Sequence, residues 1–400
     1  MSSSIKYCSS CLYPSSSAVD LVFDQNNVCS GCLASNQKQD IDWVDRREML
    51  QSLINQYKSK DDLNYDCIIP VSGGKDSYFQ THVITQIFGL KPLLVTYHGN
   101  NYTKEGSVNL SRMRKVFDVD HLIFRPSRKV LVNLNLAGFY EMGDMNWHAH
   151  VGINTYPAII AVKFNIPLMI WGEHGRTEIG GMYSLNDFNE MTAKYVREHS
   201  GRGYSLDDFI GEKYGLTKKD MLWLEYPADD KLFDLDIRGI HLNNYIKWHA
   251  NEQTELMQKE YGWQCSEETF DRTYRRISNL DDMHENGAHD YLKFIKFGYG
   301  RCTDHASKDI RQGLITRDEG IRLVRKYDSN RPKDLDRWLK YVNISEYEWD
   351  MHCDTLRDPR VWWIEKGRWF KDNLWGIPSS YGKVLNPDVI EKFEELGAVF

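Results

Sequence analysis

A glycine-rich turn with flanking hydroxyl groups is the strongest chemical signal in the sequence. The segment Ser72-Gly73-Gly74-Lys75-Asp76-Ser77 directly follows the apolar run 65–71. Two glycines let the backbone approach a polyphosphate, and successive backbone N–H groups then form a concave anion site. The two serine hydroxyls can donate to phosphate oxygens, and the lysine adds positive charge. Asp76 is expected to hold Mg²⁺ or to order the turn. The pattern predicts a site for the phosphates of a nucleotide.

Four of the eight cysteines form two closely spaced pairs near the start of the chain, Cys8 with Cys11 and Cys29 with Cys32. Each C-x₂-C pair supplies two thiolates, so the four cysteines predict a structural, tetrahedral zinc site. An iron–sulfur cluster is the alternative. Because cysteines fill all four positions, no open catalytic position is expected. The other cysteines are isolated: Cys67, Cys265, Cys302 and Cys353.

A carboxylate follows another apolar run. Glu173 comes directly after the run 166–171. In open α/β sheets, ligands bind beyond the carboxyl ends of the strands. We therefore expect Glu173 to bind Mg²⁺ or to steer ammonia as ammonium. A loop carboxylate with satisfied hydrogen bonds and no chemical role is the alternative.

The segment 298–305 is a cluster of polar residues, flanked by glycines, at the start of a predicted helix. Arg301 is suited to a phosphate or a sugar carboxylate, with Lys293 or Lys296 assisting. Asp304 and His305 are expected to orient an acceptor or to move protons. A helix cap at Thr303 or Asp304 with solvated charges is the alternative.

The end of the run 92–97 is expected to lie over the adenine or ribose of a nucleotide, which makes Thr96 and Tyr97 predicted nucleotide contacts by analogy. His148 and His150 are two residues apart on a predicted helix. Residues at that spacing point in different directions, so the pair does not predict a metal site.

The elements that must position these residues alternate between about 64 and 184. Short apolar runs predict parallel strands, separated by segments with helical periodicity. This order predicts a doubly wound parallel α/β sheet. The predicted strands are 65–71, 92–97, 121–124 and 167–171. The predicted helices are 82–88, 112–117 and 151–164.

The rest of the chain divides into three further regions. Residues 1–40 are predicted to form a zinc-ribbon module, with a strand at 18–23 and a turn at 24–27. A helix within 41–63 links this module to the α/β domain at 64–184. Residues 185–400 are predicted to be a mainly helical region that binds substrate or partners. Its best-defined helices are expected near 241–261, 288–297, 305–326 and 387–396. Its tryptophans, Trp362, Trp363, Trp369 and Trp375, are expected to pack in a core or interface rather than to form a sugar platform.

Composition limits the classes of function. The chain has 400 residues, of which 41% are hydrophobic and 27% charged, as in soluble globular proteins. It has no apolar run long enough to cross a membrane and no apolar leader after Met1, so we expect a cytoplasmic protein without membrane insertion. The net charge of −7 argues against broad binding of nucleic acid.

The motifs together resemble a known family. The turn 72–77 matches S-G-G-x-D-S, the PP-loop of the N-type ATP pyrophosphatases, although an ordinary glycine turn would share part of the pattern. The whole chain resembles the N-acetyl sugar amidotransferases of the WbpG/PseA type. The resemblance rests on the cysteine pairs, the PP-loop and the segments 166–173, 291–305 and 309–319. It implies an adenine nucleotide alpha hydrolase-like domain.

The resemblance also implies a reaction. In this family, ATP with Mg²⁺ adenylates the acetamido oxygen of an N-acetylated sugar, and ammonia then displaces AMP to give an acetamidino sugar. The acceptor would be nucleotide-activated or acidic, and the product would serve bacterial surface polysaccharides, either LPS O-antigen or nonulosonic acids. Since no fused glutaminase is evident, ammonia would come from separate glutaminase and cyclase-like subunits.

Two other classes compete with this interpretation. A PP-loop tRNA thiolase would also carry zinc-binding cysteines, but it predicts a basic surface and catalytic cysteines. The net charge and the isolated late cysteines oppose it. A zinc-ribbon binding module with a degenerate ATPase body is opposed by the intact PP-loop.

Overall fold

The computed structural model describes residues 5–59, 62–181, 184–277 and 283–400. At its centre lies a parallel sheet of five strands in the order β3-β2-β1-β4-β5. This arrangement confirms the predicted doubly wound α/β class. The strands are β1 (Cys67–Pro70), β2 (Pro92–Tyr97), β3 (His121–Phe124), β4 (Leu168–Trp171) and β5 (Arg238–His241).

Helices cover both faces of this sheet. On one face, Ile68, Leu93 and Val95 pack in a core with side chains of α5 and α6. On the other face, Ile69 and Leu94 pack with α2, α3 and α4. The sheet side chains alternate between the two cores because strand residues point to opposite faces in turn. These helices are α2 (Trp43–Tyr57), α3 (Lys75–His82), α4 (Lys104–Phe117), α5 (Arg128–Met142) and α6 (Trp147–Phe164).

The fifth strand was not predicted from the sequence and lies beyond residue 184. Its sequence, Arg-Gly-Ile-His, is not an apolar run, and it forms a strand by pairing along β4. A side chain at Gly239 would come within 2.8 Å of the Trp171 ring and 2.9 Å of the Met191 side chain. Only a glycine permits this approach. Because β5 extends to His241, the helix predicted at 241–261 begins later, and α11 spans Ala250–Tyr261.

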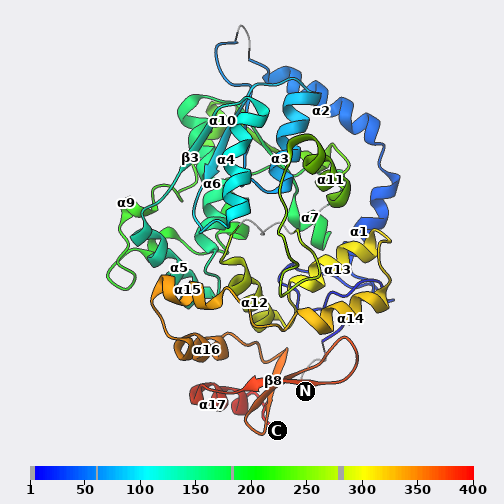
Figure 1. The fold of residues 1–400 in the computed structure, drawn as a ribbon, viewed down its shortest axis with the longest axis vertical. Helices are drawn as coiled ribbons and strands as arrows, with labels where there is room; N and C mark the ends of the chain where they lie inside the picture. The colour runs from blue at the N-terminus through cyan, green and yellow to red at the C-terminus, as the bar shows by residue number, and fades with distance from the viewer. Residues whose placement is uncertain (1–4, 60–61, 182–183, 278–282) are drawn as a thin grey trace.

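The C-terminal region, drawn from yellow to red below the sheet domain in Figure 1, is mainly helical, as predicted. The predicted helix at 305–326 is instead two helices, because Gly313 has a φ of +72° and Thr316 caps the second one. The helices are α12 (Asn286–Phe297), α13 (Arg301–Arg311), α14 (Arg317–Tyr327), α15 (Leu335–Val342), α16 (Glu346–Thr355) and α17 (Pro387–Glu395).

A small antiparallel sheet in this region was not predicted. Its strands are β6 (Trp362–Glu365), β7 (Arg368–Lys371) and β8 (Ser379–Lys383). Trp362 and Trp369 are buried in a core with Trp338 and Trp349. The expectation that these C-terminal tryptophans are core residues is confirmed for Trp362 and Trp369.

The N-terminal module differs in detail from the expected ribbon. The predicted strand at 18–23 is absent among the described residues, where Phe23 forms only a single bridge with Cys29. The second cysteine pair instead begins helix α1 (Ser30–Gln37). In Figure 1 this blue segment lies beside yellow α13 and α14, and the Leu12 N–H donates to the Ser307 hydroxyl at 3.3 Å.

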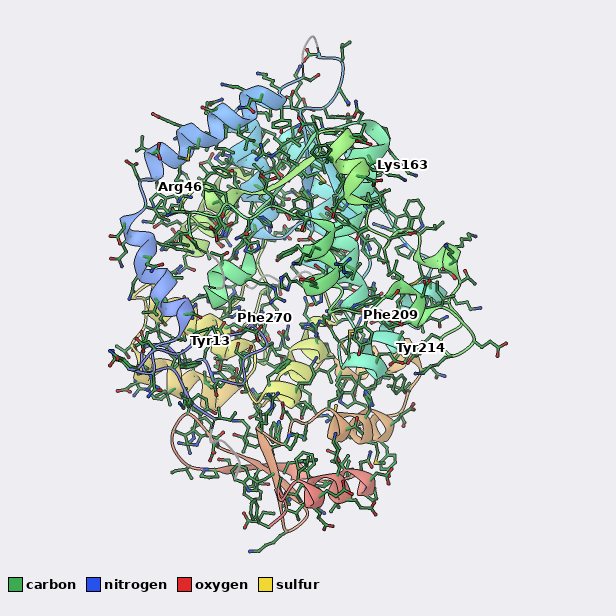
Figure 2. All side chains as sticks on the ribbon, turned by 180° about the vertical axis from the view of Figure 1, so that it is seen from behind. Tyr13, Arg46, Lys163, Phe209, Tyr214 and Phe270 are labelled. Carbon is green, nitrogen blue, oxygen red and sulfur yellow. The ribbon has the colours of Figure 1, made fainter. Side chains whose placement is uncertain are left out.

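The predicted linking helix is α2, which packs on the sheet domain. Arg46, labelled on it in Figure 2, donates to the carbonyl oxygens of Asn244 at 3.1 Å and Leu185 at 3.0 Å. Two short helices, α8 (Ala193–Tyr195) and α9 (Lys218–Met221), and α10 (Asp229–Asp234) lie between β4 and β5 in the chain. Among the described residues, no helix combines the length and apolar character needed to cross a membrane.

Candidate active site

The PP-loop connects β1 to α3, as the sequence predicts. Gly73 adopts a φ of +87°, and a β-carbon there would lie 2.7 Å from the backbone nitrogen of Leu110. Gly74 is the N-cap of α3. The indole N–H of Trp263 donates to the carbonyl oxygen of Gly73 at 3.0 Å. The loop is thus held from two sides in a conformation that requires glycine.

Side chains within the loop also hold one another. The Ser72 N–H donates to the Ser77 hydroxyl at 2.9 Å, and the Gly74 N–H donates to the Ser72 hydroxyl at 3.3 Å. The Lys75 ammonium lies 2.8 Å from both carboxylate oxygens of Asp76. Both serines therefore face the loop backbone. Phosphate binding and the roles of these residues stay predictions.

Thr96 and Tyr97, the predicted nucleotide contacts, are buried in the sheet domain. The Thr96 hydroxyl donates to the Val71 carbonyl oxygen at 2.6 Å and lies 2.8 Å from His121 Nε2. The Tyr97 ring packs in the core against Gly152 and His148. These positions do not support a contact between the Tyr97 ring and a nucleotide. Thr96 instead fixes the end of β1 that leads into the loop.

A cavity of about 520 Å³ joins the α/β domain to α13 and to the N-terminal module. Five of the residues singled out from the sequence line it, although they come from three distant segments. They are Lys75, Glu173, Arg301, Asp304 and His305. The structure therefore brings the PP-loop lysine, the carboxylate after β4 and the start of α13 to one place.

The cavity wall contains further cations that sequence reasoning missed. Lys247, Arg275, Lys308 and Arg311 also line it. Isolated lysines and arginines in helices and loops normally indicate only a solvated surface. The sequence therefore does not show that these four side chains meet at one cavity. Together they make the cavity suited to an anionic ligand.

Glu173 is paired with one of these cations. Its carboxylate accepts a hydrogen bond from Lys308 Nζ at 2.7 Å. Burial alone would raise the pKa of Glu173, but the charge and hydrogen bond of Lys308, together with the charges of Lys75 and Lys38, hold the pKa below its usual value. Glu173 is therefore ionised at neutral pH and is a fixed negative charge in the cavity wall.

The start of α13 forms an ion-pair network with α12. Arg301 donates to Asp290 at 2.7 Å and to Asp304 at 3.3 Å, and Lys293 contacts the same oxygen of Asp304. Tyr13, labelled in Figure 2, donates its hydroxyl to the other oxygen of Asp304 at 2.9 Å. The network thus brings Lys293 together with Arg301 and Asp304, and their predicted contact with a substrate stays a prediction.

Helix capping does not explain this cluster, because α13 already begins at Arg301 with Gly300 as its N-cap. His305 lies one turn further along, and its Nδ1 is 2.7 Å from the Thr273 hydroxyl. Burial and the charge of Arg275 lower the pKa of His305 well below its usual value. The imidazole is therefore neutral at pH 7 and can accept a proton only at a cost.

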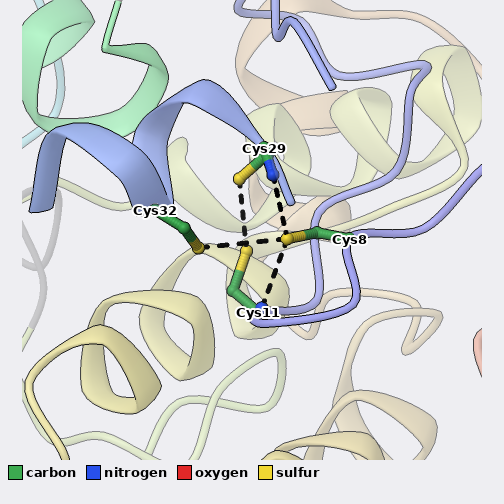
Figure 3. A group of neighbouring side chains, drawn as sticks. All are labelled: Cys8, Cys11, Cys29 and Cys32. Atoms are coloured by element: carbon green, nitrogen blue, oxygen red, sulfur yellow. Dashed lines mark hydrogen bonds between the residues drawn. The ribbon is translucent and has the colours of Figure 1, made fainter. Parts of the chain in front are cut away.

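The four N-terminal cysteines converge on one point (Figure 3). The Sγ atoms of Cys11 and Cys29 are 3.6 Å apart, and those of Cys8 and Cys32 are 3.9 Å apart. Four thiolates about 2.3 Å from a tetrahedral zinc ion would be separated by about 3.8 Å. The backbone N–H groups of Cys11 and Cys29 also point at Cys8 Sγ, at 3.4 and 3.3 Å. The residues therefore fit a structural zinc ion.

Arg311 connects this cysteine cluster to the cavity. Its guanidinium donates to Cys32 Sγ and to Cys29 Sγ, each at 3.4 Å, while the same residue lines the cavity. A β-carbon at Gly31 would collide with this guanidinium and with the carbonyl oxygen of Ile179. The glycine in the second C-x₂-C pair is the sequence signal for this close approach. The cysteine module is consequently part of the cavity wall.

Comparisons with known proteins match parts of this chain. Residues 267–373 match the family described as LPS biosynthesis protein WbpG-like, C-terminal domain. An uncharacterized protein from Methanocaldococcus jannaschii is 27% identical over 116 residues, which cover 29% of this chain and 41% of that protein. The match thus spans less than half the length of this relative.

A solved structure is also similar in part. The NH3-dependent NAD synthetase from Campylobacter jejuni, in complex with the nitrate ion, covers 49% of this chain and 92% of its own, with 13% identity and a TM-score of 0.27. This similarity is too low to support a conclusion. Residues 267–373 are therefore similar to the C-terminal domain of WbpG-like proteins, and the turn with the PP-loop sequence lies at the end of β1 in the parallel sheet.

Proposed function

We propose that the protein is an ATP-dependent amidotransferase that converts the acetamido group of an N-acetylated sugar into an acetamidino group in bacterial surface-polysaccharide biosynthesis. The observation that carries the proposal is the shared cavity. Lys75 of the PP-loop and the charged residues of α13 line this one cavity. Helix α13 lies inside the region that matches the WbpG-like domain. ATP and its acceptor would meet there.

The proposed reaction has two steps. The amide oxygen of the acceptor attacks the α-phosphorus of ATP, and pyrophosphate leaves. Ammonia then attacks the activated carbon, AMP leaves with the former amide oxygen, and loss of a proton gives the amidine. An amide oxygen is a poor leaving group until it is adenylated, so ATP supplies the driving force. The protein contributes positioning and charge stabilisation.

The described residues suit these steps. The loop N–H groups and Lys75 would hold the leaving pyrophosphate. Mg²⁺ would neutralise the phosphates, with Asp76 as its candidate ligand once Lys75 turns to the phosphate. Lys308 and Arg275 would balance further charge, and Glu173 would attract ammonium at the cavity wall. The zinc ion would be structural and would hold Arg311 in place.

The acceptor pocket favours an anionic sugar. Arg301 and Arg311 line the cavity beside Trp43 and Trp248. Guanidinium groups recognise phosphate or carboxylate oxygens, and indole rings stack on sugars or bases. A nucleotide-activated or acidic N-acetylated sugar offers both kinds of group.

The ammonia would come from separate glutaminase and cyclase-like subunits. Cys67, Cys302 and Cys353 are buried, and burial raises the pKa of each thiol. A buried neutral thiol is a poor nucleophile. Burial removes these three thiols as nucleophiles for a tRNA thiolase. Cys265, which is half-buried and two residues from Trp263, is the cysteine that such an enzyme would have to use.

A labelled-ammonia assay tests the proposal. The protein is incubated with ATP, Mg²⁺, ¹⁵N-ammonium and a panel of N-acetylated nucleotide and acidic sugars, and AMP and sugar labelling are followed. We expect AMP release matched by incorporation of ¹⁵N into one sugar. AMP formation with tRNA, and none with any acetamido sugar, would contradict the proposal.

A matched pair of variants tests the placement of ATP. Ser77→Ala removes the hydroxyl that holds Ser72, so AMP release should fall at least about 100-fold, as for the loss of one positioned catalytic donor. Ser111→Ala, on the exposed side of α4, should keep full activity. Equal activity of the two variants would show that ATP does not bind at the PP-loop.

A further inference from the structure

A second group of potential metal ligands lies outside the cysteine cluster. Asp144 follows α5, His150 lies in the first turn of α6, and His289 lies on α12. One ligand atom from each residue lies within 4.8 Å of those of the other two. Residues more than a hundred positions apart therefore present two imidazoles and a carboxylate to one point.

The separations suit a small divalent cation. His150 Nδ1 is 3.4 Å from Asp144 Oδ2, and His289 Nε2 is 3.6 Å from Asp144 Oδ1. A tetrahedral ion with bonds of about 2.0–2.1 Å to nitrogen and oxygen separates neighbouring ligand atoms by about 3.4 Å. The three ligand atoms lie within 4.8 Å of one another, so the side chains would have to draw together by at most about 1.4 Å to close on an ion.

Neighbouring groups hold these side chains in place. Asp290, itself bound by Arg272 at 2.7 Å, lies with its Oδ1 3.3 Å from His289 Nδ1. This contact turns Nε2 of His289 toward Asp144. The Asn146 N–H donates to Asp144 Oδ1 at 3.0 Å. A carboxylate behind a histidine ligand is a common feature of metal sites, because it fixes the tautomer and orientation of the ring.

Two cations oppose a metal ion at this point. Arg202 forms an ion pair with Asp144, and the half-buried Lys296 donates to the Met142 carbonyl oxygen at 3.1 Å nearby. The Arg202 side chain is 36% exposed and lies in a turn between Gly201 and Gly203. Arg202 can therefore move into solvent when a cation takes its place beside Asp144.

We propose that Asp144, His150 and His289 form a second metal site, for a divalent first-row transition cation such as Zn²⁺. A set of two imidazoles and one carboxylate favours such ions over Mg²⁺ or Ca²⁺, which prefer oxygen ligands. Three protein ligands leave at least one coordination position for water or a substrate atom. Asp290 also binds Arg301, which lines the cavity, so the ion would act next to the acceptor region. This site does not depend on the proposed function.

Metal content tests the site directly. The purified full-length protein is equilibrated with Zn²⁺, dialysed, and analysed for bound zinc by mass spectrometry and for binding of added Zn²⁺ by calorimetry. We expect one zinc more per chain in the native protein than in His150→Ala or His289→Ala. His82→Gln, a histidine bound to Tyr261 outside the cluster, should keep the native content. Equal zinc in native protein and both alanine variants would overturn the proposal.

Arg202→Gln provides a test that does not rely on disrupting the fold. If Asp144 is a metal ligand, removing the competing guanidinium should tighten Zn²⁺ binding at least several-fold. If Asp144 is only the ion-pair partner of Arg202, the variant should melt at a lower temperature and bind no additional zinc. The second outcome would overturn the proposal even if the alanine variants fail to fold.

Discussion

At the scale of single residues, Gly73 is a position that only glycine can occupy without strain. Its φ of +87° lies in the left-handed region, and a β-carbon would lie 2.7 and 2.8 Å from backbone atoms of Leu110. Backbone atoms of a packed helix cannot move aside as a flexible side chain can. The glycine therefore serves both the conformation of the PP-loop and its contact with α4.

Gly73→Ala should consequently lose both stability and activity. We expect the free energy of unfolding to fall by about 2–3 kcal/mol, the sum of left-handed strain and a backbone collision. Gly89→Ala is the matched control, because Gly89 has a φ of +64° but nothing within 4 Å of the added carbon. It should lose only about 1 kcal/mol. Urea unfolding measures both, and equal losses would show that the contact with Leu110 is unimportant.

The residue scale also shows where sequence reasoning reaches its limit. The types and order of residues were enough to predict the strand, turn and helix at the PP-loop and the convergence of the four cysteines. The partner of Glu173 was not predictable, because Lys308 is 135 positions away and becomes a neighbour only through the packing of α13. The surroundings of the Tyr97 ring were not predictable for a related reason. The end of its strand reaches the ligand-binding edge, but its ring points into the core below α6.

At the scale of elements, local sequence predicted those that are apolar and continuous. The ranges of β2 and β3 agree with prediction because each is a single apolar run. β5 and the β6–β8 sheet were missed, since each is stabilised by its neighbours rather than by its own apolar pattern. The expected strand at 18–23 failed because the cysteine cluster, not strand pairing, orders that segment.

The contact between α12 and α15 yields a pH prediction at this scale. Asp334, at the N-cap of α15, accepts a hydrogen bond from the Gly287 N–H at 3.0 Å through Oδ2, while Oδ1 is buried with no hydrogen-bond partner. Burial raises the pKa of Asp334 to about 6. The protonated carboxyl therefore stabilises the fold below about pH 4, and this stabilisation is lost as pH rises through about 6.

Asp334→Asn should remove that loss, because the amide oxygen can still accept from Gly287 without carrying a charge. We expect the variant to gain about 2 kcal/mol relative to the native protein between pH 4 and pH 7. Chemical unfolding at the two pH values measures this difference. Asp336→Asn, at an exposed residue two positions further along the chain, is the control and should show no such change. A native protein as stable at pH 7 as Asp334→Asn would contradict the assignment.

At the scale of the whole molecule, the cavity is built from segments that lie far apart in the chain. The cysteine module, the segment after β4 and α13 meet there, and Arg311 contacts two of them at once. Arg317 further ties α14 to the module, donating to the carbonyl oxygens of Cys11 and Cys8, each at 3.1 Å. The cysteine module is thus a wall of the cavity rather than an appended unit.

Loss of the metal should therefore disturb the cavity as well as the module. Cys29→Ser removes one thiolate, and zinc should be lost because three thiolates and a hydroxyl bind it far less tightly. We expect the melting temperature to fall by at least about 5 °C, since structural zinc stabilises the fold directly. Because Arg311 would lose its sulfur partners, binding of ATP or its analogues, followed by calorimetry, should also weaken. Cys265→Ser, at a half-buried cysteine outside the cluster, should change none of the three. A Cys29→Ser protein that loses zinc but keeps native nucleotide affinity would show that the module supports the fold without shaping the cavity.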